Sequence, residues 1–379
     1  MAAKYRFCFV SPYGYAALAR DPSLPFVGGA EVQQSFLAPE LARRGHRVSM
    51  VTMDFGQRHG GDANGVTVLN SHDPDAGVPV LRFVHPRLTS TWSAMKEADA
   101  DFYYQRGAGA LTGIVAAFAR RHRRRFIFAA ASDQDFDPNL GLVRYARDRA
   151  ICRYGLRRAD AVVVQTERQL HGCAGTFRRE GVVVPSCYRL DGAPAQLDGP
   201  ILWVGTVRDY KRPDLLLQVA ERMPGRRFVM IGGPGAADRT YYQTIQRQAT
   251  ALGNIDFRGP VPFAAIEPHF DRGAMLLNTS SFEGFPNTFL QAWSRGMPTV
   301  SFFDPQMVHQ GRAVACVAID VDSMVRQIES LLGSAEAWKA QSEVVRGHFE
   351  QHHGVEVAAS ILENVATGLL AKQHRESRS

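Results

Sequence analysis

The sequence contains little cysteine and no long apolar segment. Its five cysteines are odd in number and scattered, and none falls in a Cys-x-x-Cys or Cys/His ligand spacing. A disulfide framework and a zinc site are therefore not expected. The longest small-apolar run, GAGALTGIVAAFA at 107–119, is shorter than a membrane-spanning helix, and the start MAAKYRFCFVSPYG is typical of a first strand rather than of a signal peptide. We expect a soluble protein of a reducing compartment, the cytoplasm.

The chain lacks an excess of acidic residues. Its net charge is positive, and the excess of Lys and Arg lies in its first half. Residues 1–197 hold 26 Lys/Arg against 18 Asp/Glu, a net charge of +8, whereas the remaining residues hold 18 against 19, a net charge of −1. The basic density is highest in ARRHRRRF at 119–126. This run is either a solvated helix end or a surface that attracts anionic lipid headgroups or a phosphorylated substrate. No recognised nucleic-acid motif accompanies it, so nucleic acid is not an expected partner.

Both halves of the chain alternate short β-rich runs with segments of helical spacing. In the first half, YRFCFVS, HRVSMVT, FIFAAAS, AVVVQT and VVVP predict strands, and EVQQSFLAPELARRG and LVRYARDRAICRYGLRRA predict helices. After LDGAPAQLDGP at 190–200 the rhythm restarts with ILWVGT, PDLLLQVAERM, RFVMIGG, YYQTIQRQATAL, IDFRG, AMLLNT, TFLQAWSRG and TVSFF. Strands separated by single helices predict parallel sheets covered on both faces. The expected fold is α/β, with two doubly wound Rossmann-like domains facing a cleft.

The expected domain boundaries follow from this rhythm. The first domain covers 1–190, a linker covers 191–200, and the second domain covers 201–350. A C-terminal helix, 351–379, can pack back on the first domain. In open parallel sheets, ligands bind beyond the carboxyl ends of the strands, so the loops that follow strands are the places to seek a site.

A glycine pair follows the first strand, in PFVGGAEVQQ at 25–34. Gly28 and Gly29 lack side chains, so N–H groups at the helix start can approach a phosphate closely. A plain helix-start turn explains the same residues. The pattern is not G-x-G-x-x-G, which argues against a dinucleotide-binding dehydrogenase.

A cluster of cations follows the strand that opens the second half, in WVGTVRDYKRPDLLL. Arg208, Lys211 and Arg212 stand at the strand's carboxyl end, before a helix that Pro213 can open. Three cations at this place suit a diphosphate, whose anionic groups need fixed positive partners. The alternative is a surface loop that is merely basic.

Three aspartates follow the strand FIFAAA, in SDQDFDP at 132–138. Asp133, Asp135 and Asp137 could ligate a divalent metal through oxygen. Alternatively, one accepts a hydrogen bond from a substrate hydroxyl while the others cap the turn. We expect no metal here and take Asp133 as the candidate site residue.

The stretch SSFEGFPNTFLQAWSRG, from 280, places an acid in a turn and an amide in the helix that follows. Glu283 should lie at the top of the sheet, Asn287 should cap the helix, and Gln291 should fall one turn inside, facing the loop. The helix start offers N–H groups and a partial positive charge to an anion. This combination suits a phosphorylated polyol.

These motifs together resemble family 4 of the glycosyltransferases, retaining enzymes of the GT-B architecture. The resemblance rests on VGTVRDYK, on EGFPNTFLQAW as an "EGFP…EA" turn-helix, on GGAE near the start and on ADAVVVQTE at 159–167. It covers nearly the whole chain and is most specific in residues 200–303. Gln291 departs from the pattern, because the family has a second Glu at this position.

The resemblance implies roles for named residues. Lys211 would contact the donor diphosphate, and Glu283 would lie near the hydroxyls of the transferred sugar. The family arginine usually follows Gly205 directly; here Thr206 occupies that position, and Arg208 is the candidate two residues later. Asp133 stands where many relatives carry a His that faces the acceptor. The other implied donor-site residues are Gly28, Gly29, Gly232, Gly233, Val261, Gly284, Phe285, Pro286, Asn287, Thr288 and, at the ribose, Gln291.

The implied activity is a metal-independent, retaining hexosyl transfer from a UDP or GDP sugar, which serves as co-substrate with no further cofactor. The acceptor would be a saccharide or a lipid-linked saccharide of surface polysaccharide or glycolipid synthesis. The protein would then be cytoplasmic and peripheral at the inner membrane face, with 119–126 as its contact to anionic lipid. Two alternatives stay open, a non-catalytic sugar-nucleotide-binding subunit and a GT-B nucleotide-sugar epimerase.

Overall fold

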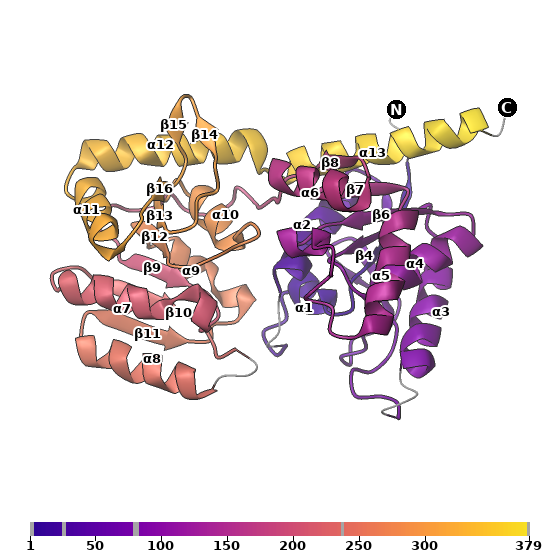
Figure 1. Cartoon of the computed structure of the whole chain (residues 1–379), viewed down its shortest axis with the longest axis horizontal. Helices are drawn as coiled ribbons and strands as arrows, with labels where there is room; N and C mark the ends of the chain where they lie inside the picture. Colours follow the sequence, from indigo (N-terminus) through magenta and orange to yellow (C-terminus); the bar gives the residue numbers. More distant parts are fainter. Residues whose placement is uncertain (1–3, 25–27, 79–82, 236–238, 377–379) are drawn as a thin grey trace. The chain divides into compact units, whose positions relative to one another are not determined.

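The computed structural model describes residues 4–24, 28–78, 83–235 and 239–376. The chain forms two compact units, Met1–Cys187 with Val355–Ser379, and Tyr188–Gly354. Each unit contains a mainly or wholly parallel sheet, with helices between most of its successive strands (Figure 1).

The first unit contains an eight-stranded sheet with the order β3-β4-β2-β1-β5-β6-β7-β8. All its neighbouring strands are parallel except β3 and β4, which are antiparallel. The order reverses at β1, between β2 and β5, which makes the loops after β1 and β5 the switch point of this sheet. The strands are β1 (Arg6–Val10), β2 (Arg47–Thr52), β3 (Gly61–Ala63), β4 (Val66–Asn70), β5 (Phe102–Arg106), β6 (Arg125–Ala129), β7 (Ala161–Val164) and β8 (Gly181–Val183).

The helices of this unit include the last helix of the chain. Helix α13 packs against α2, where Arg44 and His46 both hydrogen-bond Glu363, each at 2.7 Å. The helices are α1 (Gly14–Ala19), α2 (Gly29–Arg43), α3 (Thr89–Ala98), α4 (Ala110–Arg121), α5 (Ala146–Arg158), α6 (Glu167–Phe177) and α13 (Val355–Glu376), with short turns η1 (Phe83–Leu88) and η2 (Asp133–Phe136).

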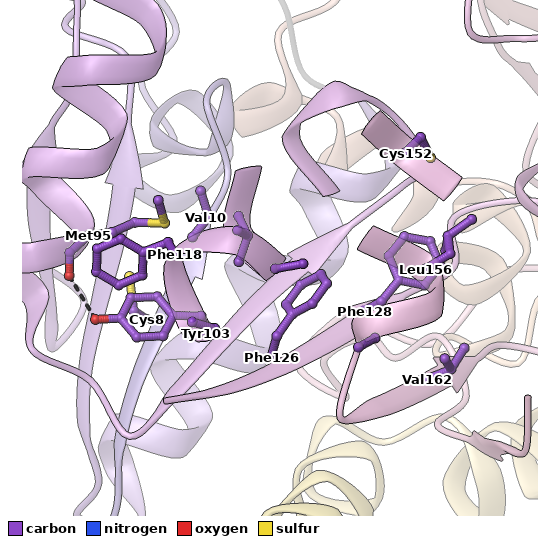
Figure 2. Close-up of a cluster of buried hydrophobic side chains, with 14 of the residues drawn as sticks. Cys8, Val10, Met95, Tyr103, Phe118, Phe126, Phe128, Cys152, Leu156 and Val162 are labelled. Carbon is purple, nitrogen blue, oxygen red and sulfur yellow. Dashed lines mark hydrogen bonds between the residues drawn. The ribbon is translucent and has the colours of Figure 1, made fainter. Parts of the chain in front are cut away.

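The core of the first unit is rich in aromatic side chains (Figure 2). The Tyr103 hydroxyl is buried there and donates a hydrogen bond to the carbonyl of Met95 at 2.7 Å, so its polar end is satisfied. Cys8 and Cys152 are among the cysteines of this core, and burial raises the pKa of Cys8 to about 12 and that of Cys152 to about 11. Both thiols stay protonated near neutral pH and pack as small apolar groups.

The second unit contains a six-stranded, all-parallel sheet with the order β11-β10-β9-β12-β13-β16. Here the order reverses between β9 and β12. The strands are β9 (Ile201–Val204), β10 (Phe228–Ile231), β11 (Ile255–Gly259), β12 (Met275–Asn278), β13 (Thr299–Ser301) and β16 (Cys316–Val317), with a separate hairpin of β14 (Val308–His309) and β15 (Arg312–Ala313). The helices are α7 (Pro213–Arg222), α8 (Arg239–Leu252), α9 (Glu267–Phe270), α10 (Asn287–Trp293), α11 (Val321–Leu332) and α12 (Ala335–His352), with turns η3 (Asp209–Lys211) and η4 (Phe263–Ala265).

Most expected elements are present, and the differences include a helix start, two strands and a helix cap. The helix predicted from residue 142 begins only at Ala146: residues 142–145 are not helical, and Val143 among them is buried in the core. The strands β4 and β5 were not predicted, although VTVLN and FYYQR are rich in β-branched and aromatic residues. Asn287 does not cap its helix: Pro286 holds the cap position and Asn287 is the first helical residue.

The domain boundary also differs from the expected one. The chain leaves the first unit after Cys187, and the segment expected as a linker, 191–200, lies in the second unit. Hydrogen bonds hold this segment there: the Ala195 N–H donates to the carbonyl of Arg295 at 2.9 Å, and the Ala193 N–H to Asp271 at 3.2 Å. Composition alone could not reveal these contacts, because their partners lie about 80 to 100 positions later.

The basic run 119–126 lies where α4 ends and β6 begins. This is the amino-terminal end of the strand, opposite the loops that follow the carboxyl ends. Arg124 pairs with Asp99, and Arg125 pairs with Asp160 at 2.6 Å, which offsets part of the charge. Arg120, Arg121 and Arg123 are exposed.

The contact between α4 and α5 depends on a residue without a side chain. A Cβ added to Gly113 would lie 2.2 Å from the carbonyl oxygen of Ile151. We predict that Gly113→Ala lowers the free energy of unfolding by about 1–3 kcal/mol, because the two helices would be forced apart. Urea unfolding followed by circular dichroism measures this change.

Gly175→Ala is the matched control, because Gly175 lies in α6 with open space around its Cα. It should raise stability by about 0.4–1 kcal/mol through the reduced entropy of the unfolded chain. Equal unfolding midpoints for the two variants would show that the helices do not meet as described.

Candidate active site

The strongest cluster of chemically active side chains lies at the switch point of the second sheet. Strands β9 and β12 are neighbours, and the loops that follow them are bonded to each other. The Ser281 N–H donates to the carbonyl of Tyr210 at 2.8 Å, and the Thr279 hydroxyl donates to the carbonyl of Lys211 at 2.7 Å. The indole of Trp203 in turn donates to the Thr279 hydroxyl at 2.8 Å. These bonds fix the two loops side by side.

Lys211 and Glu283 form an ion pair between these loops. Two further donors reach the same carboxylate oxygen, the Ser280 hydroxyl at 2.6 Å and the Asn278 amide at 3.2 Å. The side chains of Lys211 and Glu283 are only 19% and 9% exposed, so the charges are weakly screened by solvent. The sequence predicted Lys211 and Glu283 as site residues; it gave no sign of Asn278 and Ser280.

Aromatic rings border this ion pair. Tyr210 stacks on Phe282 with ring centres 4.7 Å apart, and the Lys211 ammonium lies 5.4 Å from the centre of the Tyr210 ring. Phe282 is 57% exposed. A flat apolar surface beside paired charges is suited to the apolar face of a sugar or of a base.

The predicted glycines Gly205, Gly232 and Gly233 lie where the ends of β9, β10 and β11 are hydrogen-bonded to one another. The Gly205 N–H donates to the carbonyl of Ile231 at 3.0 Å, and the Gly232 N–H donates to the carbonyl of Gly259 at 2.9 Å. A Cβ on Gly232 would lie 1.8 Å from the Gly205 carbonyl oxygen, so no other residue fits there. The carbonyl of Gly233 accepts from the Val207 N–H at 2.9 Å.

Three other predicted residues lie along these strand ends. Thr206 and Arg208 are exposed in the loop after β9, and Val261 is half-buried in the loop after β11. The Arg208 side chain lies over Gly235, where an added Cβ would approach it to 2.8 Å.

The turn 283–286 leads into α10, and its aromatic residue is fixed by stacking. Phe285 is 9% exposed and stacks on His353, with ring centres 5.2 Å apart and an interplanar angle of 22°. Thr288 is half-buried at the helix start.

Gln291 faces the interior of the unit. It is 5% exposed, and its amide nitrogen donates to the Tyr188 hydroxyl at 3.3 Å. Tyr188 in turn donates to Glu267. The sequence expected Gln291 to face the strand-end loop, and the structure instead places its amide against Tyr188. Its contact with a ribose stays a prediction.

A group of histidines lies behind the turn. His348 is 5% exposed, and its ring is 4.8 to 6.1 Å from the rings of His352, His353 and His309. In the described part of the chain, neither ring nitrogen of His348 has a hydrogen-bond partner. Burial, followed by the charges of the three neighbouring histidines, lowers the pKa of His348 to about 3.

In the first unit, the predicted glycines stand at the switch point of that sheet. Gly28 caps α2 and Gly29 is its first residue. Two charged residues that the sequence prediction missed lie in the same region: Glu31 in the first turn of α2 and Arg106 at the end of β5. Burial raises the pKa of Glu31, and the charge of Arg106 opposes that rise. Glu31 is the acidic residue of the GGAE motif, so the motif could have indicated it as a candidate.

The three aspartates after β6 have different partners. Asp135 is buried and accepts from the N–H groups of Ala131 and Ser132, at 2.6 and 3.1 Å, and Asp137 accepts from Asn139 and Gly141. Both therefore cap the turn. Among the described residues, no group of three His, Cys, Asp or Glu side chains is arranged to hold a metal ion.

Asp133, by contrast, pairs with Arg168 at the start of α6. The pair borders a pocket of about 540 Å³ that Phe136, Gln169 and Gly172 also line. Asp137 also lines this ligand-sized hollow, where it is bonded to backbone N–H groups, whereas Asp133 is paired with the arginine.

Comparison with known proteins identifies sequence relatives for most of the chain. A family model described as glycosyl transferases group 1 matches residues 199–334, and one described as a glycosyl transferase 4-like domain matches residues 28–187. D-inositol 3-phosphate glycosyltransferase of Mycobacteroides abscessus is 29% identical over 104 residues, 27% of this chain and 24% of that protein. The curated relatives are matched over 22% to 35% of their own lengths.

Solved structures resemble the whole chain. Sucrose-phosphate synthase from Thermosynechococcus elongatus is similar with a TM-score of 0.74 at 14% identity, over 97% of this chain and 99% of that one. Anabaena HepE in complex with UDP and glucose gives 0.73 at 12% identity, over 96% and 99%. These likenesses confirm the expected two-domain α/β fold of the GT-B type. Within the described helices, none has the length and apolarity needed to span a bilayer.

The low pKa of His348 predicts that acid destabilises the second unit. The unfolded chain accepts a proton near pH 6.5, whereas the folded protein resists it down to about pH 3. Stability is therefore lost as the pH falls below 6.5, by about 2 kcal/mol between pH 7 and pH 5. Urea unfolding across this range measures the loss. His348→Phe, which cannot be protonated, should flatten the dependence; an unchanged slope in that variant would contradict the assignment.

Proposed function

Because the chain belongs to the group 1, family 4-like glycosyl transferases, we propose that it transfers a sugar from a nucleotide-diphosphate sugar to a saccharide or lipid-linked acceptor. The sugar is a hexose and its anomeric configuration is retained. The observation that carries the proposal is the Lys211–Glu283 pair, which joins a fixed cation and a fixed carboxylate at the switch point of the second sheet.

The proposed chemistry follows from the charges that develop during transfer. As the bond between sugar and phosphate breaks, negative charge grows on the diphosphate and positive charge on the sugar. Lys211 and Arg208 stabilise the diphosphate, each at about 3 to 4 kcal/mol if they resemble such donors in other enzymes. Glu283 accepts hydrogen bonds from hydroxyls of the transferred sugar. Ser280 and Asn278 keep that carboxylate in place when the phosphate draws Lys211 away.

The remaining donor contacts are assigned to the strand-end backbone. Gly205, Gly232 and Gly233 have no side chains at the ends of β9 and β10, so the base and the diphosphate can approach main-chain groups there. We assign this surface to Gly205, Thr206, Gly232, Gly233 and Val261, and the sugar and phosphate side to Gly284, Phe285, Pro286, Asn287 and Thr288.

The acceptor is assigned to the first unit. Asp133 and Arg168 offer a hydrogen-bond acceptor beside donors, a combination suited to sugar hydroxyls. Gly28 and Gly29 offer N–H groups to an anion. The exposed arginines of 119–126 would bring the protein to an anionic membrane surface, where a lipid-linked acceptor resides.

A donor screen tests the proposal. Thermal-shift measurements against UDP, GDP and ADP sugars should single out one base, since a ligand that binds only the folded state raises its melting temperature. Product analysis by NMR with a saccharide panel then identifies transfer and anomeric outcome. Binding without turnover would favour a non-catalytic subunit, and an isomerised nucleotide sugar formed without acceptor would favour an epimerase.

Removing either member of the Lys211–Glu283 pair should slow turnover. We predict that Lys211→Ala lowers kcat by about 10²- to 10³-fold, because the leaving diphosphate loses a fixed positive partner. Glu283→Gln, which keeps the size but not the charge, should also lower kcat, and steady-state kinetics on the identified donor measures both.

Arg222→Ala is the control for these variants. Arg222 ends α7 and pairs with Asp322 at the surface, so its loss should leave turnover unchanged. Near-normal turnover of Lys211→Ala would sink the assignment of that lysine to the diphosphate.

A further inference from the structure

We propose that Gln291 is a positioning residue: it holds the turn-helix 283–293 against Tyr188, and an amide is required because the Tyr188 hydroxyl donates its proton to Glu267. The turn-helix carries Glu283, so the expected effect on turnover rests on the proposed function. The direction of the hydrogen bond does not rest on it.

Tyr188 stands at a crossing point of the chain. The chain passes from one unit to the other after Cys187 and returns after Gly354. These two segments lie side by side, since the Tyr188 N–H donates to the carbonyl of His353 at 2.9 Å and Tyr188 pairs with Gly354 as a parallel bridge. The Tyr188 side chain is fully buried. A residue that is hydrogen-bonded to the Tyr188 hydroxyl is therefore linked to both segments that connect the two units, near 188 and near 354.

The hydroxyl of Tyr188 explains why an amide suits position 291. A phenol has one proton, and here it is donated to Glu267. Toward Gln291 the oxygen therefore presents a lone pair, which needs a donor. The amide nitrogen of Gln291 is this donor, at 3.3 Å from the Tyr188 oxygen. An ionised glutamate has no proton to donate, so its oxygen lone pairs would face a lone pair of Tyr188.

The charges around this contact point the same way. Arg295 is 1% exposed and pairs with Glu267 at 2.5 Å and Asp271 at 2.7 Å, so two carboxylates already share one guanidinium. Burial raises the pKa of Tyr188, and the charge of Glu267 adds to the rise. A third carboxylate at position 291 would lie beside a like charge in a buried region, which is costly.

The turn-helix 283–293 contacts the two connecting segments, near 188 and near 354, at several points along its length. Before the helix, Phe285 stacks on His353, the residue whose carbonyl accepts from Tyr188. Within the helix, Gln291 bonds Tyr188. Just after the helix, Arg295 packs against Gly192, which follows Tyr188 in the chain; a Cβ added to Gly192 would come within 2.4 Å of the guanidinium carbon. Loss of the Gln291 contact should therefore loosen the turn that carries Glu283.

The test uses the pH dependence of Gln291→Glu in the full chain. A protonated glutamate can donate to Tyr188 as the amide does, and an ionised one cannot. Hydrogen exchange of residues 283–293, compared with the wild type at each pH, should be near normal at pH 6 and about tenfold faster at pH 8.5. Donor KM should rise over the same interval, with a smaller change in kcat. The charged or titratable groups that face position 291 or its partner are Tyr188, Glu267, Asp271, Arg295 and His353.

Two further variants separate this role from simple packing. Gln291→Met keeps the size and removes the donor, so its exchange should be faster at both pH values. The double variant Gln291→Glu with Glu267→Gln reverses the hydrogen-bond direction while keeping the number of carboxylates. It should restore wild-type exchange at pH 8.5.

Equal exchange of Gln291→Glu and wild type at both pH values would overturn the proposed hydrogen-bond direction, as would failure of the double variant to restore it. Altered exchange with unaltered donor KM and kcat would overturn the positioning role. If the wild-type protein turns over none of the nucleotide sugars, the proposed function fails, and hydrogen exchange still decides the direction of the bond.

Discussion

The ion pair between Lys211 and Glu283 is the interaction on which the candidate site depends. It joins two loops that follow neighbouring strands, at the point where the strand order reverses. A cation and a carboxylate that are largely shielded from water attract each other strongly. A ligand that carries both phosphate and hydroxyl groups can interact with both members. The pair therefore prepares the site before any ligand binds.

Close packing of the backbone makes that pair possible. Parallel strands end in a row, and the loops after them approach each other only where side chains are absent or turned aside. Gly232 has no side chain, and it lies against the carbonyl of Gly205. Between the loops after β9 and β12, the side chains of Trp203 and Thr279 are hydrogen-bonded to each other. Main-chain hydrogen bonds and the buried Trp203 indole thus fix the loops that carry the two charged groups.

Buried polar groups form a second layer behind the site, and their hydrogen-bond directions are constrained. Tyr188 donates to Glu267 and accepts from Gln291, while Arg295 connects Glu267 to Asp271. In a region of low dielectric constant, each unsatisfied donor or acceptor is costly, so changing one member requires a change in another. The amide at position 291 is thereby explained by its partners.

The sequence by itself determined the class of fold and most of the order of strands and helices from 201 to 303, and it indicated Lys211 and Glu283 as candidate site residues. These features follow from local patterns: apolar periodicity, and charged residues just after a strand. The tertiary structure decided the rest. It added Ser280 and Asn278 to Glu283, placed Asp135 and Asp137 in turn caps, moved the segment 191–200 into the second unit and turned Gln291 toward Tyr188. Most of these contacts depend on the packing of a particular turn or join residues far apart in sequence, and no local pattern specifies which buried donor meets which acceptor.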